Sequence, residues 1–224
     1  MTKLSTTSAL SMMFALPLLL AGCQSQSIMS APQNIVQNNT DQNSINQNNS
    51  GIDTAVINQQ TLEQQALHIQ QALANGDYAS SANDIHPTRG VRFSMYAYIR
   101  PESDKVFSRA QYLQYLHESN IRFTWGEKDG IGDLLVTPLP DYLRTWVNAS
   151  AFNDNPTITL NNSQAMGNSI DNLNKIYQNS DFVEFYSSGS EEYGGMDWRA
   201  MRLVFDSYQG KRYLVAIISD QWTI

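Results

Sequence analysis

The stretch that decides the fold of this chain is WRAMRLVF, residues 198–205, together with YLVAII, residues 213–218. Large apolar side chains alternate at Met201, Leu203 and Phe205, so this stretch predicts a strand whose other face carries Arg202. The second stretch is apolar on both faces, and we expect its strand to be central or covered. Residues 208–211 join the two strands, and residues 182–186 form a third strand-like run just before them.

Helical patterns come earlier in the chain. Leu62, Ala66, Ile69 and Leu73 follow the spacing of one helix face, and Thr61 with Gln64 has the spacing of a capping box. A second helix is indicated after the sequence SRAQ, residues 108–111, and a third near residues 137–138, with a buried face at residues 143, 146 and 147. Helices that come first and strands that gather late favour an α+β fold.

Two further strands are expected before the C-terminal group. Residues 91–99 are rich in β-branched and aromatic side chains, and residues 121–125 lead into the turn sequence Lys128-Asp129-Gly130. An Asp-Gly pair between two apolar runs predicts a hairpin or a sharp loop.

The N-terminus has the features of a bacterial lipoprotein signal. Lys3 provides a charge, residues 10–20 are apolar, and Leu20-Ala21-Gly22-Cys23 resembles a lipobox that contains the only cysteine of the chain. The apolar segment is too short to span a bilayer. The resemblance implies lipidation of Cys23 and cleavage after residue 22, and the absence of Asp at position 24 implies an outer-membrane location in a diderm envelope. An ordinary secretory signal or an N-terminal anchor helix is the alternative.

Residues 23–60 are dominated by Asn, Gln and Ser, and their isolated apolar residues follow no helical or strand period. We therefore expect a signal peptide at 1–22, a disordered tether at 23–60 and one domain at 61–224. The alternative is that the tether is a strip that folds when it binds a partner.

Charge and cysteine content exclude several classes of protein. The chain carries 14 basic and 21 acidic residues, for a net charge of -7, so nucleic acid is not an expected partner. One cysteine cannot form an intramolecular disulfide, and three scattered histidines do not form a zinc motif. We expect no metal and no cofactor.

Short motifs along the chain resemble a known fold family. ANGDY (74–78), IHP (85–87) and GVRFS (90–94) resemble the opening of NTF2-like, or cystatin-like cone, domains, and GMDWR (195–199) with DQWTI (220–224) resembles their terminal hairpin. Together with residues 125–130 and 167–169, these motifs resemble a family of bacterial envelope lipoproteins. The resemblance implies a curved antiparallel sheet that packs on N-terminal helices around a cone-shaped pocket. It implies no particular chemistry.

Residues suited to acid–base work are present without a decisive motif. NTF2-like enzymes place Asp or His inside the cone, and the candidates here are His86, His117, Asp129, Asp197 and Asp220. His86 in a loop and His117 near a helix end are also typical structural histidines. No nucleophile elbow, Walker loop or GxGxxG motif is present, so we assign no catalytic residue.

A polar-aromatic set is the best candidate for ligand binding: Trp125, Asp129, Asn168, Asp197, Arg199 and Trp222. In this interpretation aromatic faces hold an apolar or sugar-like ligand, and the polar groups orient it. In the structural alternative, Asp197 and Arg199 pair at strand ends and the tryptophans belong to the core.

Our prediction is a membrane-anchored lipoprotein whose single domain binds an envelope protein or a small envelope ligand without catalysis. The alternative is a hydrolase or isomerase that uses Asp197 or Asp129 as a general base. A third possibility is an assembly subunit that dimerises through its sheet.

Overall fold

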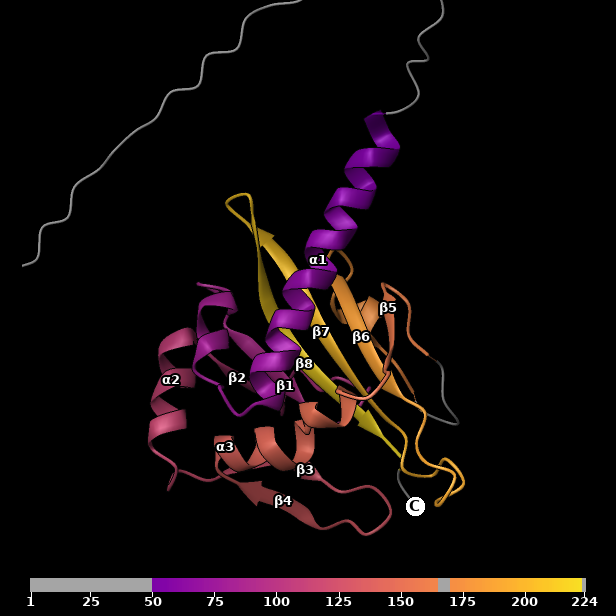
Figure 1. Cartoon of the computed structure of the whole chain (residues 1–224). Coiled ribbons are helices and arrows are strands. Elements are labelled where there is room, and N and C mark those ends of the chain that lie inside the picture. The colour runs from indigo at the N-terminus through magenta and orange to yellow at the C-terminus, as the bar shows by residue number, and fades with distance from the viewer. Residues whose placement is uncertain (1–49, 165–169, 223–224) are drawn as a thin grey trace, which may run out of the picture. The chain divides into compact units, whose positions relative to one another are not determined.

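A six-stranded sheet organises the computed structural model, which describes residues 50–164 and 170–222, with side chains from Thr61 onward (Figure 1). The α+β prediction is confirmed, and the sheet is open. Its strands, in spatial order, are β2 (Lys105–Phe107), β1 (Val91–Ser94), β8 (Lys211–Gln221), β7 (Arg199–Tyr208), β6 (Asp181–Ser187) and β5 (Thr157–Leu160).

One strand pair differs from the expected antiparallel sheet. β1 runs parallel to β8, with Arg92 opposite Ala216, whereas the other neighbouring pairs are antiparallel. The prediction of a wholly antiparallel sheet is therefore wrong at this pair. Hairpins impose antiparallel pairing only on strands that follow one another, and β1 and β8 are separated by most of the domain.

The late strands behave as their patterns predict. β6, β7 and β8 are successive antiparallel neighbours, and β8 lies between β7 and β1. Met201, Leu203 and Phe205 all pack into one core, while Val204 packs into a second core on the opposite face. Ala216 and Ile218 of β8 also belong to this second core. β8 is thus buried on both faces because each face has its own apolar layer.

Helix α1 (Ser50–Ala74) lies along one face of the sheet (Figure 1). The predicted stripe is confirmed, because Leu62, Ala66, Ile69 and Leu73 are all buried. The helix begins at Ser50, so the capping box predicted at Thr61 is wrong, and residues 50–60 of the predicted disordered tether are helical. No Gly or Pro lies between residues 52 and 61, and the Gln and Ala residues there favour helix. The signal peptide, Cys23 and the rest of the tether lie outside the described residues.

The remaining helical segments are short: η1 (Ser80–Asp84), α2 (Arg109–His117), α3 (Leu139–Tyr142), the π-helical turn η2 (Leu143–Val147), η3 (Ala149–Phe152) and α4 (Leu173–Ile176). The Ser108–Gln111 capping box at α2 is present. The helix predicted near residue 138 starts with Pro138 as its N-cap, and Leu143, Trp146 and Val147 are buried as expected.

The predicted hairpin is confirmed as β3 (Phe123–Glu127) and β4 (Leu134–Thr137), which form a separate two-stranded sheet. Strand β1 is shorter than the predicted strand over 91–99. It ends at Ser94, whose hydroxyl donates a hydrogen bond to the carbonyl of Tyr96 at 2.8 Å. This bond closes a local turn, although the sequence pattern predicts that the strand continues. The loop that follows, up to β2, forms one wall of the site below.

Candidate functional site

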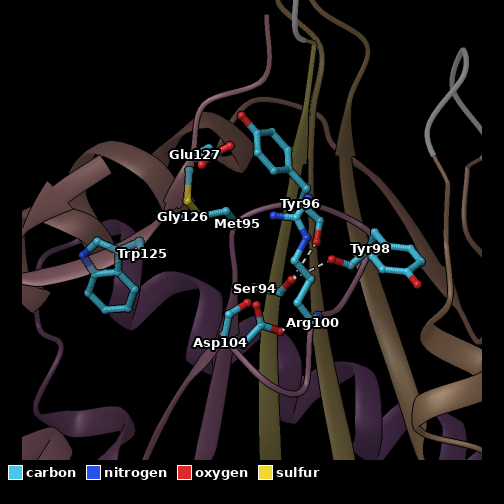
Figure 2. Close-up of a pocket in the computed structure, with 10 residues that line it drawn as sticks. Ser94, Met95, Tyr96, Tyr98, Arg100, Asp104, Trp125, Gly126 and Glu127 are labelled. Atoms are coloured by element: carbon cyan, nitrogen blue, oxygen red, sulfur yellow. Dashed lines mark hydrogen bonds between the residues drawn. The ribbon is translucent and has the colours of Figure 1, made fainter. Parts of the chain in front are cut away.

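A small pocket, open to solvent, lies where the loop after β1 meets the hairpin β3–β4 (Figure 2). Residues from 94–104 form one wall, and Trp125, Gly126 and Glu127 form the other. A β-bulge between Thr124 and Gly126 brings the hairpin close to the loop. A Cβ atom at Gly126 would lie 2.9 Å from the Met95 sulfur, so a larger residue here would displace the Met95 side chain.

Asp104 is the buried carboxyl group of the pocket. Its side chain is 7% exposed, accepts a hydrogen bond from the backbone N–H of Arg100 at 3.0 Å and lies 3.6 Å from the Arg92 guanidinium. Burial raises the pKa of Asp104 to about 6, although both arginines oppose that shift. A carboxyl group with this pKa exchanges protons near neutrality, which is the property required of a general base.

Aromatic side chains fill the space beneath the pocket. Trp125 stacks on Tyr142 with 3.7 Å between ring centroids, and its indole N–H donates to the carbonyl of Thr137 at 3.0 Å. Phe93 packs against both of these rings and also against Phe107. The interior next to this pocket is therefore occupied by packed aromatic rings.

Two of the predicted ligand-binding residues lie at or near this pocket. Trp125 contributes to its wall, and the backbone N–H of Asp129 donates to the Tyr96 hydroxyl at 2.9 Å. The hairpin turn that carries Asp129 is thereby tied to the loop after β1. The carboxylate of Asp129 is on an exposed residue of that turn.

The other predicted residues are engaged elsewhere. The carboxylate of Asp197 accepts hydrogen bonds from the backbone N–H and hydroxyl of Ser190, at 2.7 and 3.0 Å, and these bonds lower its pKa. Arg199 donates a hydrogen bond to the carbonyl of Trp146 at 2.6 Å. The predicted pairing of Asp197 with Arg199 is therefore wrong. Trp222 is 45% exposed, which contradicts the interpretation that it is a core residue. Asn168 lies outside the described residues.

The histidine candidates have structural surroundings. His86 is buried, and its Nδ1 accepts hydrogen bonds from the backbone N–H groups of Thr88 and Arg89, at 3.2 and 3.0 Å. Burial is the main cause that lowers the His86 pKa. These bonds require an unprotonated Nδ1, so the ring holds the loop before β1 in place. His117 lies in the last turn of α2.

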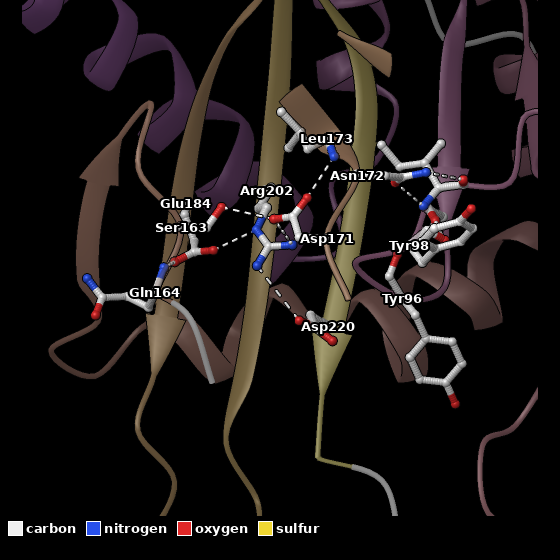
Figure 3. Close-up of polar contacts among 12 residues, drawn as sticks. Tyr96, Tyr98, Ser163, Gln164, Asp171, Asn172, Leu173, Glu184, Arg202 and Asp220 are labelled. Atoms are coloured by element: carbon white, nitrogen blue, oxygen red, sulfur yellow. Dashed lines mark hydrogen bonds and ion pairs between the residues drawn. The ribbon is translucent and has the colours of Figure 1, made fainter. Parts of the chain in front are cut away.

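A second polar cluster lies on the face of the sheet opposite α1 (Figure 3). Arg202 is 3% exposed, and its Nε donates to Glu184 at 2.6 Å. Its two terminal nitrogens lie 3.4 Å from Asp171 and 3.7 Å from Asp220, respectively. Asp220, a candidate for acid–base work in the sequence, is thus an ion-pair partner of Arg202. The prediction that the side chains of Arg202 and Leu203 lie on opposite faces of the sheet is confirmed.

This second cluster holds a neighbouring segment on the sheet. Glu184 also accepts a hydrogen bond from the backbone N–H of Gln164 at 2.6 Å, and Asp171 accepts one from the hydroxyl of Ser163 at 3.2 Å. Burial raises the pKa of Glu184, and Arg202 opposes the shift. Each charged side chain of this cluster has an ion-pair partner within the protein, so we interpret the cluster as structural.

Sequence reasoning missed the pocket residues Arg100, Asp104 and Glu127, and also Glu184. Alternation along residues 182–186 places Glu184 between apolar side chains on one strand, which is a signal for a buried acid that needs a partner. The segment around Asp104 has no comparable pattern. The carboxyl group of Asp104 instead meets Arg92, a residue of β1 twelve positions earlier in the chain.

Within the described residues, no group of three or more His, Cys, Asp or Glu side chains is placed to hold a metal ion. The helices of the described part include none whose length and hydropathy suit a membrane crossing. Comparisons with protein-family models and with curated proteins found no match to this chain.

Proposed function

We propose that this protein is a lipid-anchored protein of the bacterial cell envelope. The support is the sequence Leu20-Ala21-Gly22-Cys23, which ends an apolar segment of signal-peptide length and contains the only cysteine. In this proposal the acylated Cys23 inserts into the membrane, and more than one acyl chain gives stable attachment. In a diderm cell the domain would face the periplasm from the outer membrane.

Acyl labelling of the full-length protein tests the anchor. The wild type should be cleaved and should incorporate a labelled fatty acid, whereas Cys23→Ser should accumulate as an uncleaved and unlabelled precursor. Equal labelling of the two proteins would refute the proposal. Ser27→Ala, close to the cysteine, is a suitable control because it leaves the lipobox unchanged.

We infer that the domain is of the NTF2-like class and binds a partner or a small envelope ligand without turnover. The NTF2-like class is supported by the sequence motifs at residues 74–94 and 195–224, and the absence of turnover is supported by the packed rings of Phe93, Trp125 and Tyr142, which fill space that a substrate would need. Of the two predicted bases, Asp197 is hydrogen-bonded to Ser190, and Asp129 lies in an exposed turn. The pocket described above is small and open to solvent.

Incubation of the purified full-length protein with fractionated envelope material separates binding from catalysis. We expect a component to be retained unaltered, at no more than one equivalent per protein. Accumulation of several product molecules per protein would contradict the non-catalytic proposal.

One observation favours the enzyme as a second candidate. Asp104 combines a location in the pocket with a pKa of about 6, and it is therefore a better general base than Asp197 or Asp129. Such an enzyme should lose turnover in Asp104→Asn and retain it in Asp197→Asn. A rate that rises with pH through about 6 in the wild type would support it.

A further inference from the structure

An exposed apolar surface lies at one end of the sheet, where the loop between β6 and β7 meets the end of β8 (Figure 1). Three large side chains there are exposed: Tyr193 by 55%, Met196 by 54% and Trp222 by 45%. Tyr193 and Met196 belong to one turn, in which the N–H of Met196 donates to the carbonyl of Tyr193 at 3.0 Å. The N–H of Trp222 donates to the carbonyl of Trp198, the last residue of the loop, at 3.2 Å. This hydrogen bond joins Trp222 to the loop.

Two further aromatic side chains, Trp198 and Tyr186, continue this surface into the sheet. Arg199 lies opposite Gln221 in the register of β7 and β8, so Trp198 is the cross-strand neighbour of Trp222. Such neighbours present their side chains on the same face. The Trp198 ring also packs against Tyr186 of β6, with 6.3 Å between the ring centroids. Trp222 is therefore the exposed end of a row of aromatic side chains at the ends of β6, β7 and β8.

The loop between β6 and β7 is held in shape by polar contacts and by glycine. The carboxylate of Asp197 accepts hydrogen bonds from the N–H and the hydroxyl of Ser190, at 2.7 and 3.0 Å. Gly189 has a φ of +78°, and a Cβ atom there would lie 2.6 Å from the Asp197 carboxylate, so this position requires glycine. The loop therefore keeps its shape without burying its large apolar side chains. A surface that is already ordered loses little conformational entropy when a partner binds.

The charge around this surface is negative and unbalanced. Residues 188–198 contain three acidic residues and no Lys or Arg. Glu191 and Glu192 are exposed, and neither carboxylate pairs with a described residue. Arg199, the next cation along the chain, donates to the carbonyl of Trp146. An anionic lipid surface or an acidic polymer would be repelled here, whereas a positively charged partner would be attracted.

We propose that this surface, formed by Tyr193, Met196 and Trp222 with Glu191 and Glu192 at its border, binds a positively charged segment of another envelope protein. Lys and Arg suit it because their aliphatic stems pack on aromatic rings while their cationic groups are attracted to ring faces and to carboxylates. Apolar side chains between the basic residues of the segment would cover the exposed methionine. This inference rests on the proposed binding function and specifies the chemistry of its partner.

Three peptides that differ only in charge test the proposal. Three copies of the repeat Gly-Lys-Leu-Lys form the basic peptide, and Gln or Glu in place of every Lys gives the neutral and the acidic peptide. Each peptide carries a fluorophore and is titrated with the full-length protein, and its fluorescence anisotropy is followed at low salt, where exposed charges are least screened. We expect the basic peptide to bind with a dissociation constant on the order of 100 μM, the neutral peptide about tenfold more weakly, and the acidic peptide not at all.

Aromatic variants locate the binding surface. Trp222→Ala should weaken binding of the basic peptide about tenfold, and Tyr193→Ala about threefold or more, because exposed Trp and Tyr dominate many protein interfaces. Leu113→Ala, at an exposed apolar position of α2, is the control and should bind as the wild type does. Both aromatic side chains are exposed, so the variants should fold, and their thermal unfolding midpoints check this.

Acidic variants test the choice of partner. Glu191→Gln combined with Glu192→Gln should weaken binding of the basic peptide about fivefold at low salt, and this difference should disappear at about 0.5 M salt. Glu102→Gln combined with Asp133→Asn removes the same charge from exposed positions outside the surface and is the matched control.

The proposal is overturned if the three peptides bind equally, if none of them binds, or if the surface variants bind as their controls do. Displacement of the basic peptide by a trimer of N-acetylglucosamine would also overturn it, since the surface would then be a glycan site. Retention of envelope material tests the proposed function separately. If the wild type and Trp222→Ala retain the same material equally, the proposed function stands and this surface is not the one that binds.

Discussion

Two neighbouring side chains of β7, on opposite faces of the sheet, are buried by different chemistry. On the face that packs against α1, Leu203 lies in an apolar core with Ile69 and Phe185. On the opposite face the adjacent residue, Arg202, is buried just as deeply, among Glu184, Asp171 and Asp220. Apolar contacts tolerate a range of shapes, whereas buried ion pairs require each partner at a specific place. Replacing Arg202 and replacing Leu203, two neighbouring residues of β7, should therefore destabilise the protein for different physical reasons.

The largest effect is expected when the ion-pair cluster of Glu184, Asp171 and Asp220 loses Arg202. Arg202→Met keeps an aliphatic side chain of similar length but leaves the buried Glu184 carboxylate without its cation. We expect a loss of about 3–5 kcal/mol in the free energy of unfolding, measured by urea denaturation near neutral pH. The exposed Arg144→Met, which breaks a surface pair with Asp141, should cost about 0.5 kcal/mol or less.

The pH dependence of that loss identifies its cause. Without Arg202 the folded-state pKa of Glu184, already raised by burial, should rise further. An acid with a raised folded-state pKa destabilises the protein as pH rises above the ordinary range for Glu, so the loss should shrink as the solution is acidified. A loss that is the same at about pH 5 and about pH 8 would contradict an electrostatic origin.

The apolar core around Leu203 should respond almost as strongly, but without dependence on pH. Leu203→Ala removes a fully buried side chain, and we expect a loss of about 3 kcal/mol from lost burial and the resulting cavity. Because no titrating group changes its surroundings directly, urea denaturation should give the same loss at about pH 5 and about pH 8. A marked pH dependence would show that the two faces are coupled through β7.

Asp104 provides an intermediate case, a buried carboxyl group at the edge of the sheet. Its folded-state pKa of about 6 exceeds the ordinary value of 3.8, so only the folded state holds the proton between these values. This group's contribution to stability therefore falls as pH rises from about 4 to about 6, by about 3 kcal/mol, and is level above that range.

Relative to the wild type, Asp104→Asn should gain stability over the same interval. The exposed Asp133→Asn is the control and should shift little with pH. A difference between Asp104→Asn and wild type that is constant with pH would refute the assignment.

A change outside both faces should have the smallest effect. Ser108→Ala removes the hydroxyl that accepts the backbone N–H of Gln111 at 3.2 Å, and we expect a loss of about 1 kcal/mol by urea denaturation. Ser207→Ala, at an exposed strand position, serves as the control and should change stability by less than about 0.5 kcal/mol. A loss at Ser108 no larger than the control would mean that the capping box is not needed once α2 is packed.

Local patterns predicted the elements of the fold because their causes are local. The alternation at residues 201–205, the stripe from Leu62 to Leu73 and the cap at Ser108 each depend on side chains within a few positions of one another. The start of α1 was wrong because a capping sequence can also occur inside a longer helix. The parallel pairing of β1 with β8 had no local signal.

The candidate site was predicted less well than the fold. Trp125 is in the pocket, but Asp197, Arg199 and Trp222 do not converge there with it. Their motifs share a polar-aromatic composition, which says nothing about distance in space. Asp104 was missed because its carboxyl group becomes unusual only through burial, and burial is a tertiary property.

The sequence by itself determined the α+β class, the three C-terminal strands, the hairpin around Asp129-Gly130 and the opposite faces of Arg202 and Leu203. Only the tertiary structure decided which acids surround Arg202, that β8 has a parallel neighbour and that Arg100 and Glu127 face one pocket. The physical reason is the distance along the chain over which each interaction acts. Periodicity, capping and turn preference act over a few residues, whereas ion pairing, desolvation and strand neighbours depend on where distant segments meet.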